Sequence, residues 1–127
     1  MIGRLKRRAE FLQVAAANRK WVAPGLILQV RRQPSSESPI GDAAPAAQPG
    51  PVRVGFTASR KVGNAVRRNR ARRRLRAVAA EVLADAEPGM DFVLIARAAT
   101  VERDYQALVG DLVAGLKRLK LYRGEAS

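Results

Sequence analysis

The chain has 127 residues, a hydrophobic fraction of 47% and a formal net charge of +13, which predict one folded domain over 1–127 rather than wholesale disorder. It contains no Cys and no His, so disulfides, Cys/His zinc sites and catalysis by a Cys or His nucleophile are excluded. The positive charge indicates a polyanionic partner, first nucleic acid and second an anionic membrane surface, and no apolar run reaches the roughly 18 residues of a membrane helix.

The N-terminal segment is rich in arginine and has a single acid, Glu10, within its first 20 residues. This composition is found in organellar transit peptides, but the segment lacks the apolar stretch of a secretory signal. Phe11 and Val14 instead favour a short core helix over 8–17. Phe11 is then either an ordinary core residue or a partly exposed aromatic residue on which a nucleic-acid base stacks.

A first strand is predicted by the apolar run over 26–30, which we expect to end in solvent at Arg31 and Arg32. There is room for one more short strand near Val22. Trp21, the only tryptophan, either caps the core or faces RNA.

A second strand is predicted over 52–59, where apolar residues alternate with polar ones and place Phe56 on the apolar face of a half-buried strand. The segment before it, 33–51, holds five of the seven prolines and no aromatic residue. It cannot bury enough apolar surface to offset its ordering entropy, so we expect a flexible hairpin insertion.

The most basic stretch runs from Arg60 to Arg76 and holds nine of the 24 Lys and Arg residues without one Asp or Glu. Apolar residues at helical spacing predict a helix with one buried face, and Gly63-Asn64 supply a turn and an N-cap. These apolar residues are Leu75, Val78, Ala79, Val82 and Leu83. The opposite side of the helix is expected to carry Asn69, Arg70, Arg73 and Arg74. A solvated charged helix is the plainer interpretation, but unmixed positive charge favours a polyanionic partner.

The C-terminal part begins where Pro88-Gly89 end the basic helix. A continuous apolar run over 91–97 predicts a strand covered on both faces, and the periodicity of 105–119 predicts an amphipathic helix that starts near Asp104. We expect the tail, 121–127, to be frayed. The whole chain predicts an α+β fold, a small two-layer sandwich in which a mixed sheet of about four strands packs with three helices.

The 11 Asp and Glu residues show no spacing typical of metal ligands, and no Walker-type phosphate loop is present. The sequence therefore argues against an active site and against a metal site within the polypeptide.

The run Lys-Val-Gly-Asn-Ala-Val-Arg-Arg-Asn-Arg-Ala-Arg-Arg over 61–73, closed by Arg76, resembles the signature of the bacterial ribonuclease P protein subunit, which centres on an Arg-Asn-Arg triplet, here 68–70. The resemblance implies that family's fold, with a left-handed βαβ crossover against the usual right-handed rule. It also implies a cytoplasmic protein cofactor that binds the catalytic RNA and the 5′ leader of precursor tRNA and promotes endonucleolytic 5′ maturation of tRNA. In that assembly the RNA subunit catalyses cleavage and holds most of the Mg²⁺, and the protein alone is inactive.

The same resemblance implies site residues by position. Contacts to the catalytic RNA are expected from Arg60, Lys61, Asn64, Arg68, Asn69, Arg70, Arg72, Arg73 and Arg76. The leader cleft is expected to involve Phe11, Ala15 and Phe56. Family members often have a second aromatic residue one turn after Phe11, where this chain has Ala15. Because the leader is unpaired and variable in sequence, base stacking plus backbone contacts is the expected mode of binding.

Other interpretations stay open. A general RNA-binding or ribosomal protein of the same fold would share the charge, although the Arg-Asn-Arg context disfavours it. A DNA-binding protein is disfavoured because no helix-turn-helix pattern is present. A membrane-surface helix is disfavoured because the apolar face is committed to the core and lacks interfacial aromatic residues.

Overall fold

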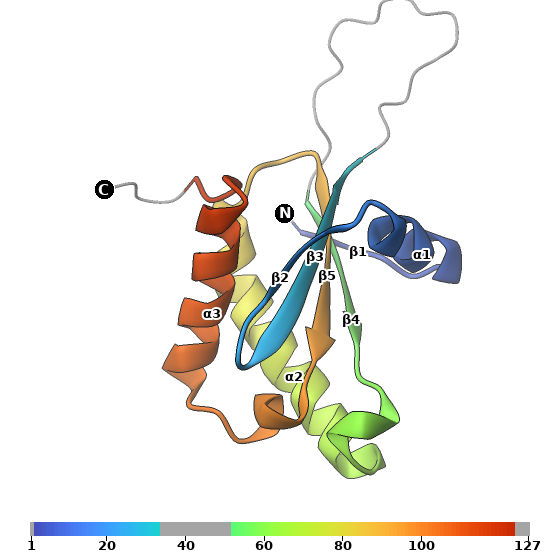
Figure 1. Cartoon of the computed structure of the whole chain (residues 1–127), viewed down its shortest axis with the longest axis vertical. Helices are drawn as coiled ribbons and strands as arrows, with labels where there is room; N and C mark the ends of the chain where they lie inside the picture. The colour runs from blue at the N-terminus through green and yellow to red at the C-terminus, as the bar shows by residue number, and fades with distance from the viewer. Residues whose placement is uncertain (1, 34–51, 124–127) are drawn as a thin grey trace, which may run out of the picture.

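The computed structural model describes residues 2–33 and 52–123 (Figure 1). In chain order its elements are β1 (Gly3–Arg4), α1 (Arg8–Ala16), β2 (Arg19–Val22), β3 (Leu26–Arg32), β4 (Arg53–Thr57), η1 (Arg60–Val62), α2 (Ala65–Val82), η2 (Leu83–Asp85), β5 (Met90–Ala96), η3 (Ala98–Val101) and α3 (Tyr105–Arg118). Nearly all of the predicted insertion, 34–51, and the end of the predicted tail, 124–127, lie outside the described residues. The start of that tail is ordered, because Leu121 is buried and Tyr122 bridges to Ala86.

The strands form one mixed, five-stranded sheet in the order β1-β4-β5-β3-β2. β1 and β5 each pair with β4 in parallel, whereas β3 pairs antiparallel with β5 and with β2. The predicted short strand near Val22 is β2, and β1 is the strand that the sequence did not predict. A strand of two residues has no periodicity of its own, which explains why the sequence predicted about four strands.

Helices α2 and α3 lie against one face of the sheet, and α1 lies against the other (Figure 1). The predicted α+β sandwich is confirmed, with α1 adding a partial third layer. β4, α2 and β5 form the parallel βαβ unit to which the expected left-handed crossover applies. The hand of that crossover stays a prediction.

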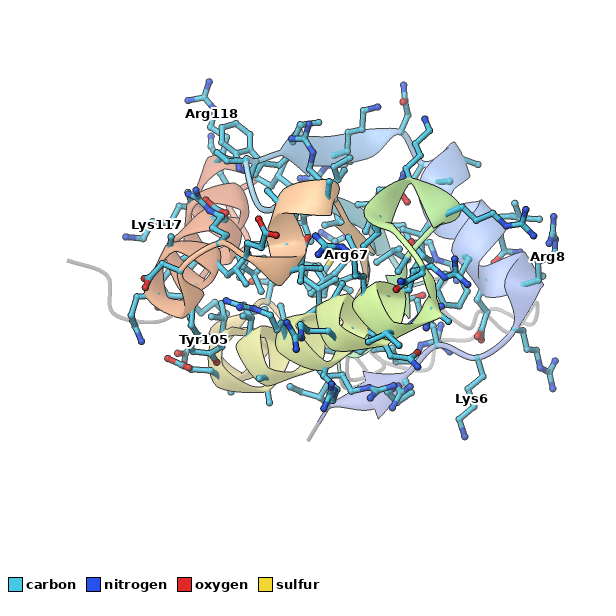
Figure 2. The ribbon with its side chains drawn as sticks, turned by 90° about the horizontal axis from the view of Figure 1, so that it is seen from below. Lys6, Arg8, Arg67, Tyr105, Lys117 and Arg118 are labelled. Carbon is cyan, nitrogen blue, oxygen red and sulfur yellow. The ribbon has the colours of Figure 1, made fainter. Side chains whose placement is uncertain are left out.

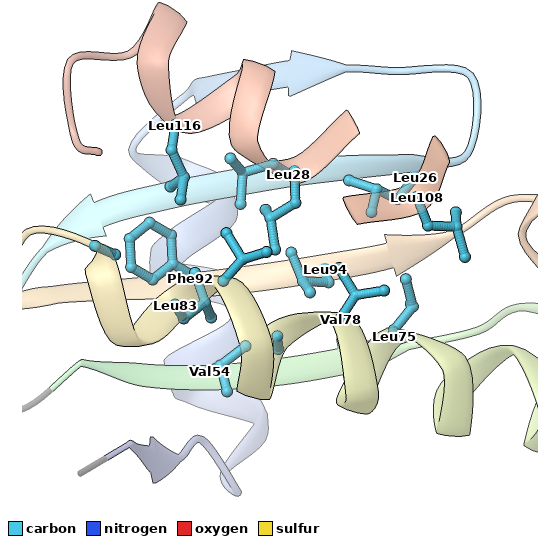
Figure 3. Packing of buried hydrophobic residues seen from close by; sticks show 14 of the residues in the cluster. Leu26, Leu28, Val54, Leu75, Val78, Leu83, Phe92, Leu94, Leu108 and Leu116 are labelled. Carbon is cyan, nitrogen blue, oxygen red and sulfur yellow. The ribbon is translucent and has the colours of Figure 1, made fainter. Parts of the chain in front are cut away.

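The main core lies between the sheet and the layer of α2 and α3 (Figure 3). Strand alternation directs Leu26 and Leu28 of β3 toward these helices, and it does the same for Phe92 and Leu94 of β5. Their fully buried partners on the helices include Leu75, Val78, Leu108 and Leu116. The apolar periodicities that predicted α2 and α3 are therefore those of their buried faces.

A smaller core lies on the opposite face of the sheet, under α1. Its buried residues are Leu5, Val14 and Val93, with Phe11 and Ile95 packed around them. β5 therefore carries buried residues on both faces, as its continuous apolar run predicted. β4, expected to be half-buried, is also covered on both faces at its centre.

Two arginines expected in solvent are partly buried. The side chain of Arg31 is 12% exposed and pairs with the carboxylate of Asp91. Arg74, expected on the outer side of α2, donates to the carbonyl oxygens of Val101 and Arg103. Both differences from the expected exposure have one cause. A long arginine side chain can bend away from the direction that periodicity gives its Cβ and reach an acceptor on a neighbouring element.

Candidate nucleic-acid interface

The basic face of α2 comprises the side chains that the sequence assigned to the catalytic RNA: Arg60, Lys61, Asn64, Arg68, Asn69, Arg70, Arg72, Arg73 and Arg76. They come from η1, the following turn and the first part of α2. All are exposed except Arg68 and Arg72, which are half-buried. Figure 2 looks toward α2 and shows nitrogen-tipped side chains along its length. The structure therefore brings these predicted residues together on one helix and the turn that precedes it.

Local interactions position the start of this face. The Oδ1 atom of Asn64 accepts the backbone N–H of Arg67 at 2.9 Å, which confirms the predicted N-cap. Gly63 adopts a φ of 140°, a conformation that favours glycine. Arg68 Nη1 donates to the carbonyl oxygen of Gly63 at 3.1 Å, so this arginine is less exposed than expected. The turn before α2 thus orients both the helix and its first cations.

The charge of the basic face is not neutralised within residues 2–33 and 52–123, because none of its side chains forms a salt bridge there. The two arginines of the stretch that were not assigned to RNA do have internal partners. Arg67 Nη2 lies 3.4 Å from Oε2 of Glu102, and Arg74 donates to two carbonyl oxygens near η3. The remaining cations repel one another until an anion binds them.

Two shallow hollows open along the basic face. One is lined by Asn69, Arg72, Arg73 and Arg76. The other is lined by Arg70, Arg73, Arg74 and Val101. Guanidinium groups that converge on a concave site suit phosphate oxygens, which accept paired hydrogen bonds from the planar fork. Because Arg73 lines both hollows, they adjoin and could follow a phosphate backbone.

Phe11 lies on the opposite face of the sheet, over Gly55 of β4. A Cβ atom at Gly55 would come within 2.4 Å of Cζ of Phe11, so this close approach requires glycine. Ala15 lies one turn further along the same side of α1 and is exposed. Phe11 and Ala15 therefore share the face that the sequence assigned to the leader.

Next to α1, the same sheet face carries a row of paired residues that the sequence did not single out. Thr57, Ile95, Ile27 and Val22 are successive register partners on β4, β5, β3 and β2. The first three are half-buried and Val22 is 50% exposed. Alternation along each strand could have indicated which residues share this face. Their exposure follows from the shortness of α1, which covers only part of the face. We call these four residues the open row.

Phe56 does not join Phe11. Successive strand residues point to opposite faces of a sheet, and because Gly55 meets Phe11, the ring of Phe56 faces α2. The expected leader cleft of Phe11, Ala15 and Phe56 is therefore corrected. Phe11 and Ala15 lie on one face of the sheet, and Phe56 lies on the other.

A network of polar side chains holds α1 on the sheet. The buried carboxylate of Asp91 accepts hydrogen bonds from Arg53 and from Arg31. Each arginine also reaches α1, since Arg53 Nη1 lies 3.2 Å from Oε2 of Glu10 and Arg31 Nη1 donates to Oε1 of Gln13 at 2.7 Å. The position of Phe11 is thus tied to the charge of a buried carboxylate in β5.

The pKa shifts in this network favour the charged forms. The hydrogen bond to Asp91 raises the pKa of Arg53. Hydrogen bonds from the backbone N–H groups of Arg7 and Lys6 lower the pKa of Glu10. The Glu10–Arg53 contact between α1 and the sheet is therefore made by ionised groups.

Among the described residues two carboxylates are buried, and donors of the protein already satisfy both. Asp91 is held by guanidinium groups, and Asp111 accepts from Arg103 and from the backbone N–H of Gly25. Within the described part of the chain, no three acidic side chains gather as a possible metal site. These donor sets do not fit a resident Mg²⁺ ion. In the same ranges, no helix is both long and apolar enough to cross a membrane.

Comparison with known families gives a match over most of the chain: the model described as Ribonuclease P matches residues 3–120. The chain belongs to this family. The ribonuclease P protein component of Paramagnetospirillum magneticum is 53% identical over 119 residues, which cover 93% of this chain and 83% of that protein. The component of Gluconacetobacter diazotrophicus is 48% identical over 117 residues, covering 91% of this chain and 89% of the relative.

Solved structures agree on the fold. The RNase P protein of Staphylococcus aureus superposes with a TM-score of 0.68 at 21% identity, covering 94% of this chain and 96% of that chain. The RNase P protein of Thermotoga maritima gives a TM-score of 0.69 at 23% identity, covering 91% and 96%. The family resemblance and the α+β fold expected from the sequence are thereby confirmed.

Proposed function

We propose that this chain is the protein subunit of a bacterial ribonuclease P, a cytoplasmic ribonucleoprotein that matures the 5′ end of tRNA. The observation that carries the proposal is the basic face of α2, whose cations have no acidic partner among the described residues. Membership of the family supports the RNA subunit of ribonuclease P and its precursor tRNA substrate as the polyanions that this face would bind.

The basic face of α2 is proposed to dock on the RNA subunit. Arginines that line adjoining hollows can each take a phosphate oxygen pair, and the buried side of the helix anchors them in the main core. If about six cations neutralise phosphates, the logarithm of the binding constant should fall against the logarithm of salt concentration with a slope of about −4 to −5.

The leader of precursor tRNA is proposed to lie on the opposite face of the sheet, along Phe11 and the open row. Single-stranded RNA of variable sequence is held by stacking on aromatic residues and by apolar contact. Phe11 supplies the ring, and the open row supplies the apolar surface beside it. Phe56 takes no part in this surface.

The polypeptide is proposed to assist an RNA catalyst. The Mg²⁺ ions of the reaction would be held by the RNA subunit, since the carboxylates described here do not fit them. The protein's cations would replace part of the ionic screening between the two RNA molecules. Its α1 face would add affinity for precursor over mature tRNA.

The decisive experiment is single-turnover cleavage of precursor tRNA by the RNA subunit alone, the protein alone and both together, across Mg²⁺ concentrations. We expect no cleavage by the protein alone, cleavage by the RNA alone at high Mg²⁺, and restoration by the protein at low Mg²⁺. The gain should shrink when the leader is trimmed to one or two nucleotides. Cleavage by RNA-free protein, abolished by one carboxylate substitution, would overturn the proposal. Binding to many RNAs with no gain in cleavage would indicate a general RNA-binding protein.

A double variant of the basic face and a control variant on α3 test the docking face. Arg70 and Arg73 are exposed and lie on the basic face, whereas Arg118 is an exposed arginine at the end of α3 (Figure 2). The double variant Arg70→Ala/Arg73→Ala should weaken binding to the RNA subunit and reduce the magnitude of the salt slope by about 1.4 to 1.8. Arg118→Ala should leave both nearly unchanged. Equal losses from the two proteins would contradict docking through α2.

A further inference from the structure

A third hollow adjoins the basic face of α2 and differs from it in chemistry. It lies between the sheet and α2, and its apolar lining comes from Ile2, Val54 and Phe56 on one side and from Ala79 and Ala80 on the other. Its volume is about 310 Å³, at the lower end of the roughly 300–1,000 Å³ of small-molecule sites. A hollow of this volume can therefore hold one planar group but not several in a row.

Among the described residues, the charged groups that line this hollow come from two distant parts of the sequence, Arg4 of β1 and Arg76 of α2. Their guanidinium carbons lie 5.7 and 6.0 Å from the ring centroid of Phe56. Neither arginine forms a salt bridge within residues 2–33 and 52–123. The hollow thus combines an aromatic ring and apolar walls with two cations that are free to meet an anion.

Arg76 also lines the hollow that it shares with Asn69, Arg72 and Arg73 on the basic face. An arginine-lined hollow and an apolar, aromatic hollow therefore meet at one side chain. This is the chemistry of a single nucleotide, which carries an anionic phosphate on one side and a flat, largely apolar base on the other. Duplex RNA cannot offer a base in this way, because its bases are stacked and paired.

We propose that the hollow beside Phe56 receives one unpaired nucleobase of the RNA that docks on α2, with Arg76 between that base and the adjoining phosphates. The inference rests on the proposed docking of α2 and adds to it a base-reading site on the face of the sheet away from Phe11. Phe56 then acts as a stacking residue for the docked RNA.

Ala80→Leu tests the site by filling it. Ala80 is exposed, and leucine is a good helix former, so the variant should fold with an unchanged melting temperature. Its affinity for the RNA subunit should fall by about 5- to 150-fold, the range expected for loss of one stacked base. The salt slope should stay unchanged, because no phosphate contact is removed. Ala114→Leu, the same change at an exposed site of α3, is the matched control and should bind as the parent protein does.

Chemical probing of every unpaired RNA base supplies a direct readout. The parent protein and Ala114→Leu should alter the reactivity of one unpaired base that Ala80→Leu leaves as in free RNA. Phe56→Leu keeps an apolar side chain but removes the ring. Like Ala80→Leu, it should leave this base as reactive as in free RNA, but with a smaller loss of affinity than Ala80→Leu. Any of three results for Ala80→Leu would overturn the proposal. Its affinity could equal that of the parent protein, its salt slope could fall as it would on loss of a phosphate contact, or its pattern of base reactivity could match the parent's. If Arg70→Ala/Arg73→Ala still weakens binding in that case, docking stands and only the base site fails.

Discussion

Arg53 and Asp91 are direct register partners on β4 and β5, and their side chains form two hydrogen bonds of 2.9 and 2.8 Å. The carboxylate is fully buried, and Arg31 donates to it as well at 3.0 Å. The pair therefore places an ionised group inside the sheet, where it is stable only while its partners remain.

Asp91→Ala should lower the free energy of unfolding by about 3–5 kcal/mol, because it leaves two guanidinium groups without their shared acceptor. Urea unfolding followed by circular dichroism measures the loss. Glu102→Ala removes a carboxylate that is 75% exposed and pairs with Arg67 at 3.4 Å, so it should cost less than about 1 kcal/mol. Similar losses from both substitutions would show that burial of Asp91 has no energetic consequence.

Gly55→Ala should displace Phe11, because the new Cβ would lie 2.4 Å from Cζ of the ring. Overpacking of this kind costs about 1–3 kcal/mol. We expect weaker binding of precursor tRNA with a long leader and unchanged binding of the RNA subunit, which is proposed to dock on α2, on the other face of the sheet. Gly110→Ala is the control, since among the described residues no heavy atom apart from the neighbouring backbone of α3 lies within 4 Å of its Cβ position, and it should stabilise α3 slightly. An unchanged preference for precursor over mature tRNA in Gly55→Ala would contradict the role of Phe11.

Glu10 should make the stability of the protein depend on pH. Backbone N–H groups of Arg7 and Lys6 hold its pKa below the ordinary value of 4.5, so the folded state favours the carboxylate. The contribution of Glu10 to the free energy of unfolding is present above the pKa that Glu10 has in the unfolded chain. It is lost as pH falls through the lower pKa that Glu10 has in the folded protein. The melting temperature of Glu10→Gln should therefore lie below that of the parent at neutral pH, and the gap should close as pH falls below about 4.5. A gap that stays constant down to low pH would exclude this linkage.

Lys120 follows Leu119, the C-cap of α3, and has a backbone conformation that favours glycine, with a φ of 63°. The N–H of Leu121 donates to the carbonyl oxygen of Leu116 and that of Lys120 to the carbonyl oxygen of Lys117, the pattern of a Schellman motif. Lys120→Gly should raise the free energy of unfolding by about 1 kcal/mol. Asn18→Gly, at a φ of 56°, should gain less, because asparagine tolerates this conformation better than lysine. Equal gains at both positions would contradict the argument.

The features that the sequence predicted are those with a long local signal. The apolar spacing from Leu75 to Val82 indicated α2 and its buried face, and Gly63-Asn64 indicated its start, because cap chemistry acts within a few residues. The continuous apolar run of β5 indicated a strand covered on both faces. The assignment of arginines to the catalytic RNA came from the family resemblance and stays a prediction. Arg67, which is not among them, pairs with Glu102.

What the sequence did not predict depends on contacts between distant segments. Alternation put Phe56 on one face of its strand, but only the sheet order shows that α1 covers the other face. The pairing of Arg31 with Asp91 joins β3 to β5, and the pairing of β1 with β4 joins two segments about fifty residues apart. The open row exists only once β2, β3, β5 and β4 are in register.

Of the residues that the structure describes, three are buried in the cluster under α1, Leu5, Val14 and Val93, whereas α2 and α3 share the larger main core. Local opening requires least free energy where the fewest apolar contacts are lost. The amide hydrogens of α1 should therefore exchange with solvent through openings that leave α2 and the rest of the sheet protected. A helix that lifts from the sheet while the rest stays folded would make the surface around Phe11 adjustable, so the proposed leader site could accommodate leaders of different sequence without loss of the folded core.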